Sequence, residues 1–112
     1  MLSDADRGAL EDMRDNIARV TQFVRGLDLE GFLADMKSFY AATRALEIIS
    51  EASRRLSPAF KRRFPDIRWK AVAGSGDIDR HNYEDVLERR VWATIQEALP
   101  PLRALVEAEL QE

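Results

Sequence analysis

Cysteine is absent from the sequence, and histidine occurs only once, at position 81. The lack of cysteine excludes disulfides and thiolate metal sites. It is also typical of proteins in a reducing compartment, so we expect a cytoplasmic protein. A single histidine excludes a histidine-rich metal site, and it excludes any mechanism that needs two histidines unless a dimer supplies the second one.

Long apolar runs are also missing. No segment approaches the roughly 18 apolar residues of a membrane-spanning helix, and the acidic start MLSDADRGALED does not fit a signal peptide. The net charge of −3, from 20 acidic and 17 basic residues, gives no general attraction to nucleic acid. We therefore expect no membrane partner, and any contact with nucleic acid must come from a local basic patch.

No stretch alternates between apolar and polar residues with period two, so strands are not expected. Apolar residues recur instead at helical spacing in three long stretches. The first runs from the N-cap residue Ser3 to Gly26, the second runs from the N-cap residue Asp28 to about Leu56, and the third lies at the C-terminal end. The fold predicted for residues 1–112 is a single all-α domain, an antiparallel helical bundle of three long helices plus short ones.

Short helices are expected between the second and third long ones. Ser57 and Pro58 suit the N-cap and the first helical position of one of them, and Asp66 could cap another. Pro100 and Pro101 fall inside the last long stretch. Because the apolar stripe resumes in phase after these prolines, we expect one bent helix rather than two separate ones.

The only histidine lies in the polar segment GSGDIDRHNYED, directly after Arg80 and two residues before Tyr83. Histidine can give and take a proton near neutral pH, and a guanidinium suits a phosphate. With the phenolic hydroxyl of Tyr83, Arg80 and His81 could bind and process a phosphodiester. On spacing alone, the more common interpretation is an ordinary polar turn before a helix.

The wider pattern resembles the HepT-like family of the HEPN superfamily, the toxin half of HEPN/MNT toxin–antitoxin pairs. The resemblance spans nearly the whole chain, and its combined order and spacing are specific, although each piece alone is weak. It is carried by four segments: RALEIISEASRRL (44–56), FPDIRWKAVAGSGD (64–77), RHNY (80–83) and VWATIQEALPPL (91–102).

The resemblance implies an all-α homodimer whose His-x-Tyr segments face a shared cleft, and a metal-independent ribonuclease that needs no cofactor. It implies RNA as the substrate and a small nucleotidyltransferase as the antitoxin partner. Carried over to this chain, His81 would be the general acid and base, with Arg80 beside it. Tyr83 would be the residue that the partner modifies with AMP.

One departure from the family pattern concerns an arginine that is expected before the histidine, with four to six residues between the two. No arginine occurs between Trp69 and Asp79, and the position five before His81 is Gly76. Adjacent helical residues point about 100° apart, so Arg80 and His81 need not converge on one phosphate. Two functions stay open: a ribonuclease that uses Arg80 or an arginine of a second protomer, and a weak or inactive interaction protein that a nucleotidyltransferase binds and modifies. A DNA-binding regulator is disfavoured by the acidic charge.

Other polar residues have two interpretations each. Arg44, Glu47 and Glu51 share one helix face, and with Asn82 they could orient the catalytic pair. The commoner alternative for the first three is an ion-pair ladder along the helix. A basic segment could be an RNA-binding rim or a solvated surface, and it comprises Arg54, Arg55, Lys61, Arg62, Arg63 and Arg68. Phe60, Phe64, Trp69 and Trp92 are expected to pack in the core, and the tryptophans alternatively in a dimer interface.

Overall fold

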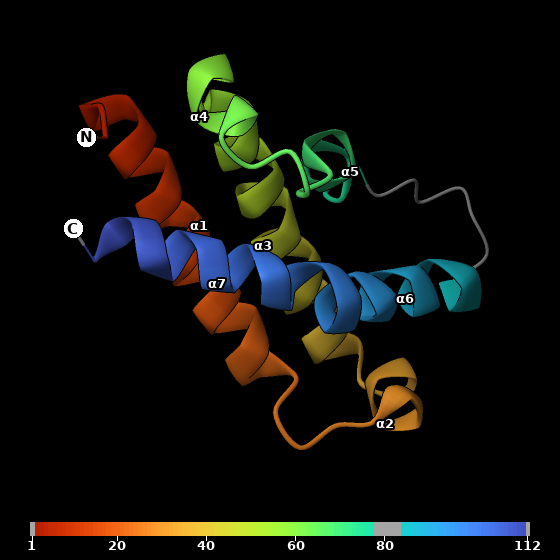
Figure 1. The fold of residues 1–112 in the computed structure, drawn as a ribbon. Coiled ribbons are helices and arrows are strands. Elements are labelled where there is room, and N and C mark those ends of the chain that lie inside the picture. The colour runs from red at the N-terminus through yellow and green to blue at the C-terminus, as the bar shows by residue number, and fades with distance from the viewer. Residues whose placement is uncertain (1, 78–83, 112) are drawn as a thin grey trace.

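The computed structural model describes residues 2–77 and 84–111, and within these ranges it contains helices and no strand. This confirms the predicted all-α class (Figure 1). The two long N-terminal helices are α1 (Asp4–Phe23) and α3 (Met36–Arg55). The remaining elements are α2 (Leu29–Ala34), α4 (Pro58–Arg62), α5 (Trp69–Gly74), α6 (Glu84–Ala93), η1 (Thr94–Ala98) and α7 (Leu99–Leu110).

The core lies where α1, α3 and α7 meet. α1 and α3 pack side by side, and α7 crosses them (Figure 1). Each helix contributes one stripe of apolar side chains that are almost completely buried, as the helical spacing predicted. Burying such a side chain contributes about 1.5–3 kcal/mol, so the stripes hold the bundle together. The fully buried side chains of these stripes include Leu10, Met13, Ile17, Leu46, Ile49, Leu102 and Val106.

The helix expected from Asp28 to Leu56 is two helices, so that prediction was wrong. Asp28 does cap α2, where its carboxylate accepts the backbone N–H of Gly31 at 2.8 Å. The helix then stops, because Asp35 adopts an extended backbone and caps α3 by accepting the backbone N–H of Ser38. A second carboxylate at an N-cap position restarts the helix in a new direction. The end of α3 at Arg55 agrees with the prediction.

Other helix ends follow the expected caps, with one exception. Ser3 caps α1, and Ser57 with Pro58 begins α4. Asp66 does not cap α5, which begins at Trp69 and has no side-chain cap. The indole N–H of Trp69, the first residue of the helix, donates to the backbone carbonyls of residues 61 and 64 and so ties the start of α5 to the end of α4.

The C-terminal helices form one continuous rod, as predicted (Figure 1). A kink was expected at Pro100 and Pro101, and the structure has a π-helical turn, η1, that ends with one residue between it and Pro100. Neither proline has an N–H to donate to the preceding turn, and a wider π turn accommodates this loss. The apolar stripe therefore continues from Val91 and Ile95 into α7.

A buried carboxylate ties the start of α1 to the corner between α3 and α4. Asp6 accepts the backbone N–H and the hydroxyl of Ser57, each at 2.8 Å. Only 7% of Asp6 is exposed, so these two bonds replace the water that burial removes. They fix the end of α3 from which the chain continues to α4 and α5.

Candidate functional site

The predicted catalytic segment lies outside the described residues. Arg80, His81, Asn82 and Tyr83 all belong to positions 78–83, so the roles assigned to them stay predictions. What the structure does describe is the frame around this segment. The chain reaches it from α5 and leaves it into α6.

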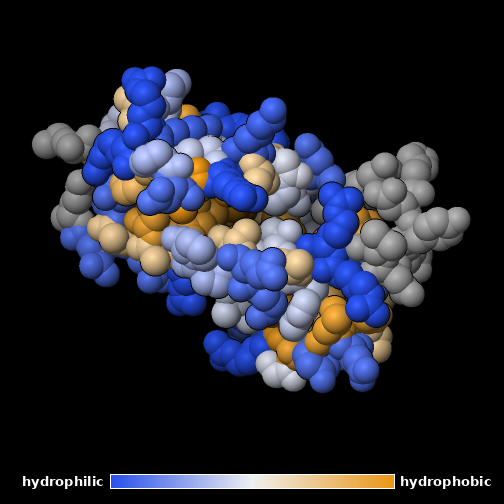
Figure 2. All heavy atoms as spheres, turned by 45° about the vertical axis from the view of Figure 1, so that its right-hand side comes forward, coloured by the Kyte–Doolittle hydropathy of each residue, from blue (hydrophilic) through white to orange (hydrophobic). Residues whose placement is uncertain are grey.

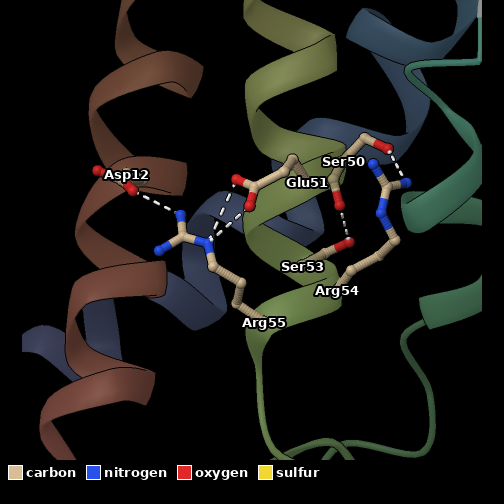
Figure 3. A network of polar contacts seen from close by, with 6 residues as sticks. All are labelled: Asp12, Ser50, Glu51, Ser53, Arg54 and Arg55. Carbon is tan, nitrogen blue, oxygen red and sulfur yellow. Dashed lines mark hydrogen bonds and ion pairs between the residues drawn. The ribbon is translucent and has the colours of Figure 1, made fainter.

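The α3 residues that were predicted to orient the catalytic pair are all exposed, and no ion pair joins Arg44, Glu47 and Glu51 to one another. Glu51 instead pairs with Arg55, whose Nε lies 3.1 Å from its Oε1 (Figure 3). The Arg55 Nη2 also lies 2.6 Å from Asp12 Oδ2 on α1. Glu51 therefore belongs to a link between α3 and α1, and the ladder interpretation does not apply to these three residues.

Hydrogen bonds from α3 hold the C-terminal end of α5. Arg54 Nη1 donates to the Ala73 carbonyl at 2.7 Å and to Ser50 Oγ at 2.9 Å. The Ser50 hydroxyl donates to the same Ala73 carbonyl. Figure 3 shows the Ser50 and Arg54 side chains projecting together from one side of α3. Carbonyls in the last turn of a helix lack helical partners, so this pair of side chains caps α5. These contacts could not be predicted from the sequence, because Ser50 and Arg54 lie 23 and 19 residues from Ala73 in the chain.

A cleft of about 500 Å³ opens between α5 and the C-terminal rod. Two exposed arginines line it, Arg68 just before α5 and Arg90 on α6, and the π-helical turn forms part of its wall. π-helical turns often occur at functional sites, and guanidinium groups bind phosphate through two N–H donors at once. The residues that line the cleft are Asp66, Ile67, Arg68, Ala71, Val72, Gly74, Ser75, Arg90, Thr94, Glu97, Ala98, Leu99, Pro101 and Leu102.

The basic segment is only partly available to a ligand. Arg54 caps α5 and Arg55 pairs with Asp12 and Glu51, as described above. Arg63 pairs with Glu109 at 2.9 Å and lies over the rings of two phenylalanines. These three arginines therefore have structural roles, and the residues left for an RNA-binding rim are Lys61, Arg62 and Arg68.

The aromatic residues pack as expected. Phe60 is buried and contacts Phe64 and Trp69, with ring centroids 5.1 Å and 6.3 Å away. Trp92 packs on Phe32 with the ring centroids 5.2 Å apart. These contacts place the rings in or against the core and leave them poorly suited to stack on bases.

A membrane-spanning helix would have to be long and strongly apolar, and none of the helices that the structure describes meets both conditions.

Comparison with known proteins places these features in a family. The sequence matches the family described as Ribonuclease HepT-like over residues 13–109. It is 40% identical over 98 residues to the protein named Probable ribonuclease HepT of Thermococcus cleftensis, covering 88% of this chain and 89% of that protein. Two proteins named as candidate RNases are each 33% identical. One is from Methanocaldococcus jannaschii (88% of this chain, 90% of that protein), and the other is from Caldanaerobacter subterraneus subsp. tengcongensis (95% of both). No solved structure shows a significant match.

Proposed function

Because the chain belongs to the HepT-like ribonuclease family, we propose that it is the ribonuclease toxin of a HEPN/MNT toxin–antitoxin pair and cleaves RNA without a metal ion. The family match includes His81 and its neighbours. The structural observation that carries the proposal is the cleft, whose walls include α5 and α6. These are the two elements that the His81 segment joins in the chain, so a substrate in the cleft would lie close to both of them.

The proposed chemistry needs an acid–base group and a cation. His81 removes the proton from a ribose 2′-hydroxyl, and the resulting oxygen attacks the adjacent phosphorus. The bond from phosphorus to the 5′-oxygen breaks, and that oxygen takes up a proton. The products are a 2′,3′-cyclic phosphate and a 5′-hydroxyl. Arg80, or an arginine of a second protomer, stabilises the charge that develops on the phosphate oxygens.

Arg68 and Arg90 are proposed to hold the RNA backbone in the cleft. Both guanidinium groups are exposed, and neither makes an ion pair with another described residue. Their charges therefore remain available to phosphate groups. Asp66 and Glu97 in the same lining repel phosphate, which favours binding near the two arginines over the rest of the cleft.

The test is RNA cleavage by the purified protein in EDTA, beside the H81A variant. We expect the wild type to release fragments ending in a 2′,3′-cyclic phosphate and H81A to release none. A substrate with a single 2′-deoxy sugar should resist cleavage at that position, because it lacks the nucleophile. Cleavage that persists in H81A would assign the activity to another residue or to a contaminating nuclease.

Regulation by a nucleotidyltransferase forms the second part of the proposal. The partner is proposed to transfer AMP to Tyr83 and so block the toxin. The toxin is also proposed to act as a homodimer. Three large apolar side chains, Phe23, Met36 and Tyr40, are exposed near the junction of α1 and α3, and such surface suits an interface. Figure 2 shows apolar surface at this lower end of the molecule. Incubation with the partner and ATP should add one AMP to the wild type and none to Y83F.

An inactive interaction protein is the second candidate, and Gly76 favours it. This position has no side chain to contact a phosphate, although the resemblance predicts an arginine here. If neither the wild type nor H81A cleaves RNA while Tyr83 is modified by the partner, this second function applies.

A further inference from the structure

Gly76, the second residue after α5, lies against α3 as closely as packing allows. A Cβ atom built at Gly76 would lie 2.8 Å from the Glu47 Cα, 2.8 Å from the Ser50 Cβ and 3.0 Å from the Leu46 carbonyl oxygen. Ordinary contacts of a Cβ begin at 3.4 Å, so a side chain at Gly76 would have to move away by at least about 0.6 Å. Two of the three atoms belong to the helix backbone, which cannot rotate aside as a side chain can.

The glycine is required by this close approach and not by backbone conformation. Among the described residues only Gly26 has a positive φ, at 81°, where it ends the turn after α1. Gly74, two residues earlier than Gly76, has nothing within 4 Å of the position of its Cβ. The two glycines therefore differ sharply in what a side chain would meet, although they are neighbours in one turn. α3 is itself held in place, because its residues Leu46 and Ile49 are fully buried in the core.

We propose that Ser50, Arg54 and Gly76, which we name the α3–α5 seat, position the catalytic segment relative to the cleft. Ser50 and Arg54 fix the end of α5 through the Ala73 carbonyl, and Gly76 fixes the chain three residues further on. His81 follows Gly76 by five residues. The seat therefore sets the point from which the chain departs from α3 toward His81. Its members are positioning residues that touch no substrate, and their catalytic consequence rests on the function proposed above.

The seat makes a specific prediction about the arginine that the resemblance leads one to expect at this position. The G76R variant supplies that arginine, yet we expect it to lower activity, because its Cβ and chain have no space against α3. G76A carries the same clash in its smallest form. G8A is the matched control, since it adds the same methyl group at a glycine of α1 whose Cβ position also has nothing within 4 Å and which does not line the cleft.

The first measurement is the rate of RNA cleavage by folded protein, with the folded fraction taken from circular dichroism. We expect kcat of G76A to fall roughly 10- to 100-fold, because a displacement on the order of 1 Å can cost about 100-fold. KM should stay within about threefold, because the substrate contacts are unchanged. G8A should match the wild type. Should G76A not fold, R54Q and R54K serve instead: R54K keeps a cationic donor and should recover part of the kcat that R54Q loses.

The second measurement does not depend on cleavage. His81 is the only histidine, so its imidazole NMR signals are unambiguous, and their pH titration reports on its surroundings. We expect both the chemical shifts and the titration midpoint to differ between the wild type and G76A, and to be the same in the wild type and G8A.

The outcomes separate the seat from the proposed function. Altered His81 signals in G76A but not in G8A support the seat, even if the wild type cleaves no RNA and the ribonuclease proposal fails. Unaltered signals together with an unchanged kcat per folded molecule would overturn it, even if the wild type is a ribonuclease. A loss of stability alone, with kcat and the His81 signals retained, would also overturn it, since the seat would then be structural only.

Discussion

The cleft arginines lead to a quantitative prediction about RNA binding. Arg68 and Arg90 line one cleft, and neither is occupied by an ion pair with another described residue. Each phosphate that a cation neutralises on a single strand changes the slope of log affinity against log salt by about 0.7. The double variant R68Q/R90Q should therefore have a salt slope shallower by about 1.4. Raising salt fourfold should weaken wild-type binding about sevenfold more than it weakens the variant.

Fluorescence anisotropy with a short labelled RNA measures this slope, and H81A is the suitable background because it should bind RNA without cutting it. The control is R14Q/R19Q, which removes the same charge from exposed positions on α1, away from the cleft lining. A purely global effect of charge would change both double variants equally. If R68Q/R90Q keeps the wild-type slope, RNA does not follow this cleft.

Three further predictions concern the frame of the site. D6A should cost roughly 2–4 kcal/mol of unfolding free energy in urea denaturation, since two hydrogen bonds from Ser57 end on this buried carboxylate; a cost under about 0.5 kcal/mol would contradict this role. R55A should cost less than about 1 kcal/mol, and less still at high salt, because its ion pairs are exposed; a large cost independent of salt would contradict that view. Hydrogen bonds from the side chain and backbone of Ser38 lower the pKa of Asp35, so its stabilisation is present above pH 3.8 and is lost as pH falls through the lower folded-state value. The difference in unfolding free energy between wild type and D35N should therefore shrink below pH 3.8, and a constant difference would refute this linkage.

Local signals predicted most of the helix ends. Ser3 and Ser57 cap helices because each has a side-chain oxygen in reach of a free backbone N–H, and this depends only on neighbours in sequence. The buried stripes were equally predictable, because helical spacing alone decides which residues share a face. These features needed no knowledge of the tertiary structure.

Helix boundaries were harder to predict where nearby residues favour different structures. Asp35 lies within an apolar pattern that continues through it, so periodicity hid the cap that divides α2 from α3. Asp66 looked like a cap, but the Trp69 indole is anchored on carbonyls at the end of α4 and the helix begins there. At Asp35 one residue therefore overrode a pattern summed over many, and at Asp66 a tertiary contact of Trp69 overrode a local cap signal.

The candidate site shows most clearly what a motif comparison leaves out. The absence of an arginine at position 76 looks like the loss of a phosphate-binding group when only side-chain chemistry is considered. Judged by packing, the same position has no room for a Cβ, and the end of α5 is tied to α3 by Ser50 and Arg54. A side chain could enter there only if the turn moved away from α3, and the turn leads directly to His81. If this chain cleaves RNA, its phosphate-binding charge must therefore come from outside the seat.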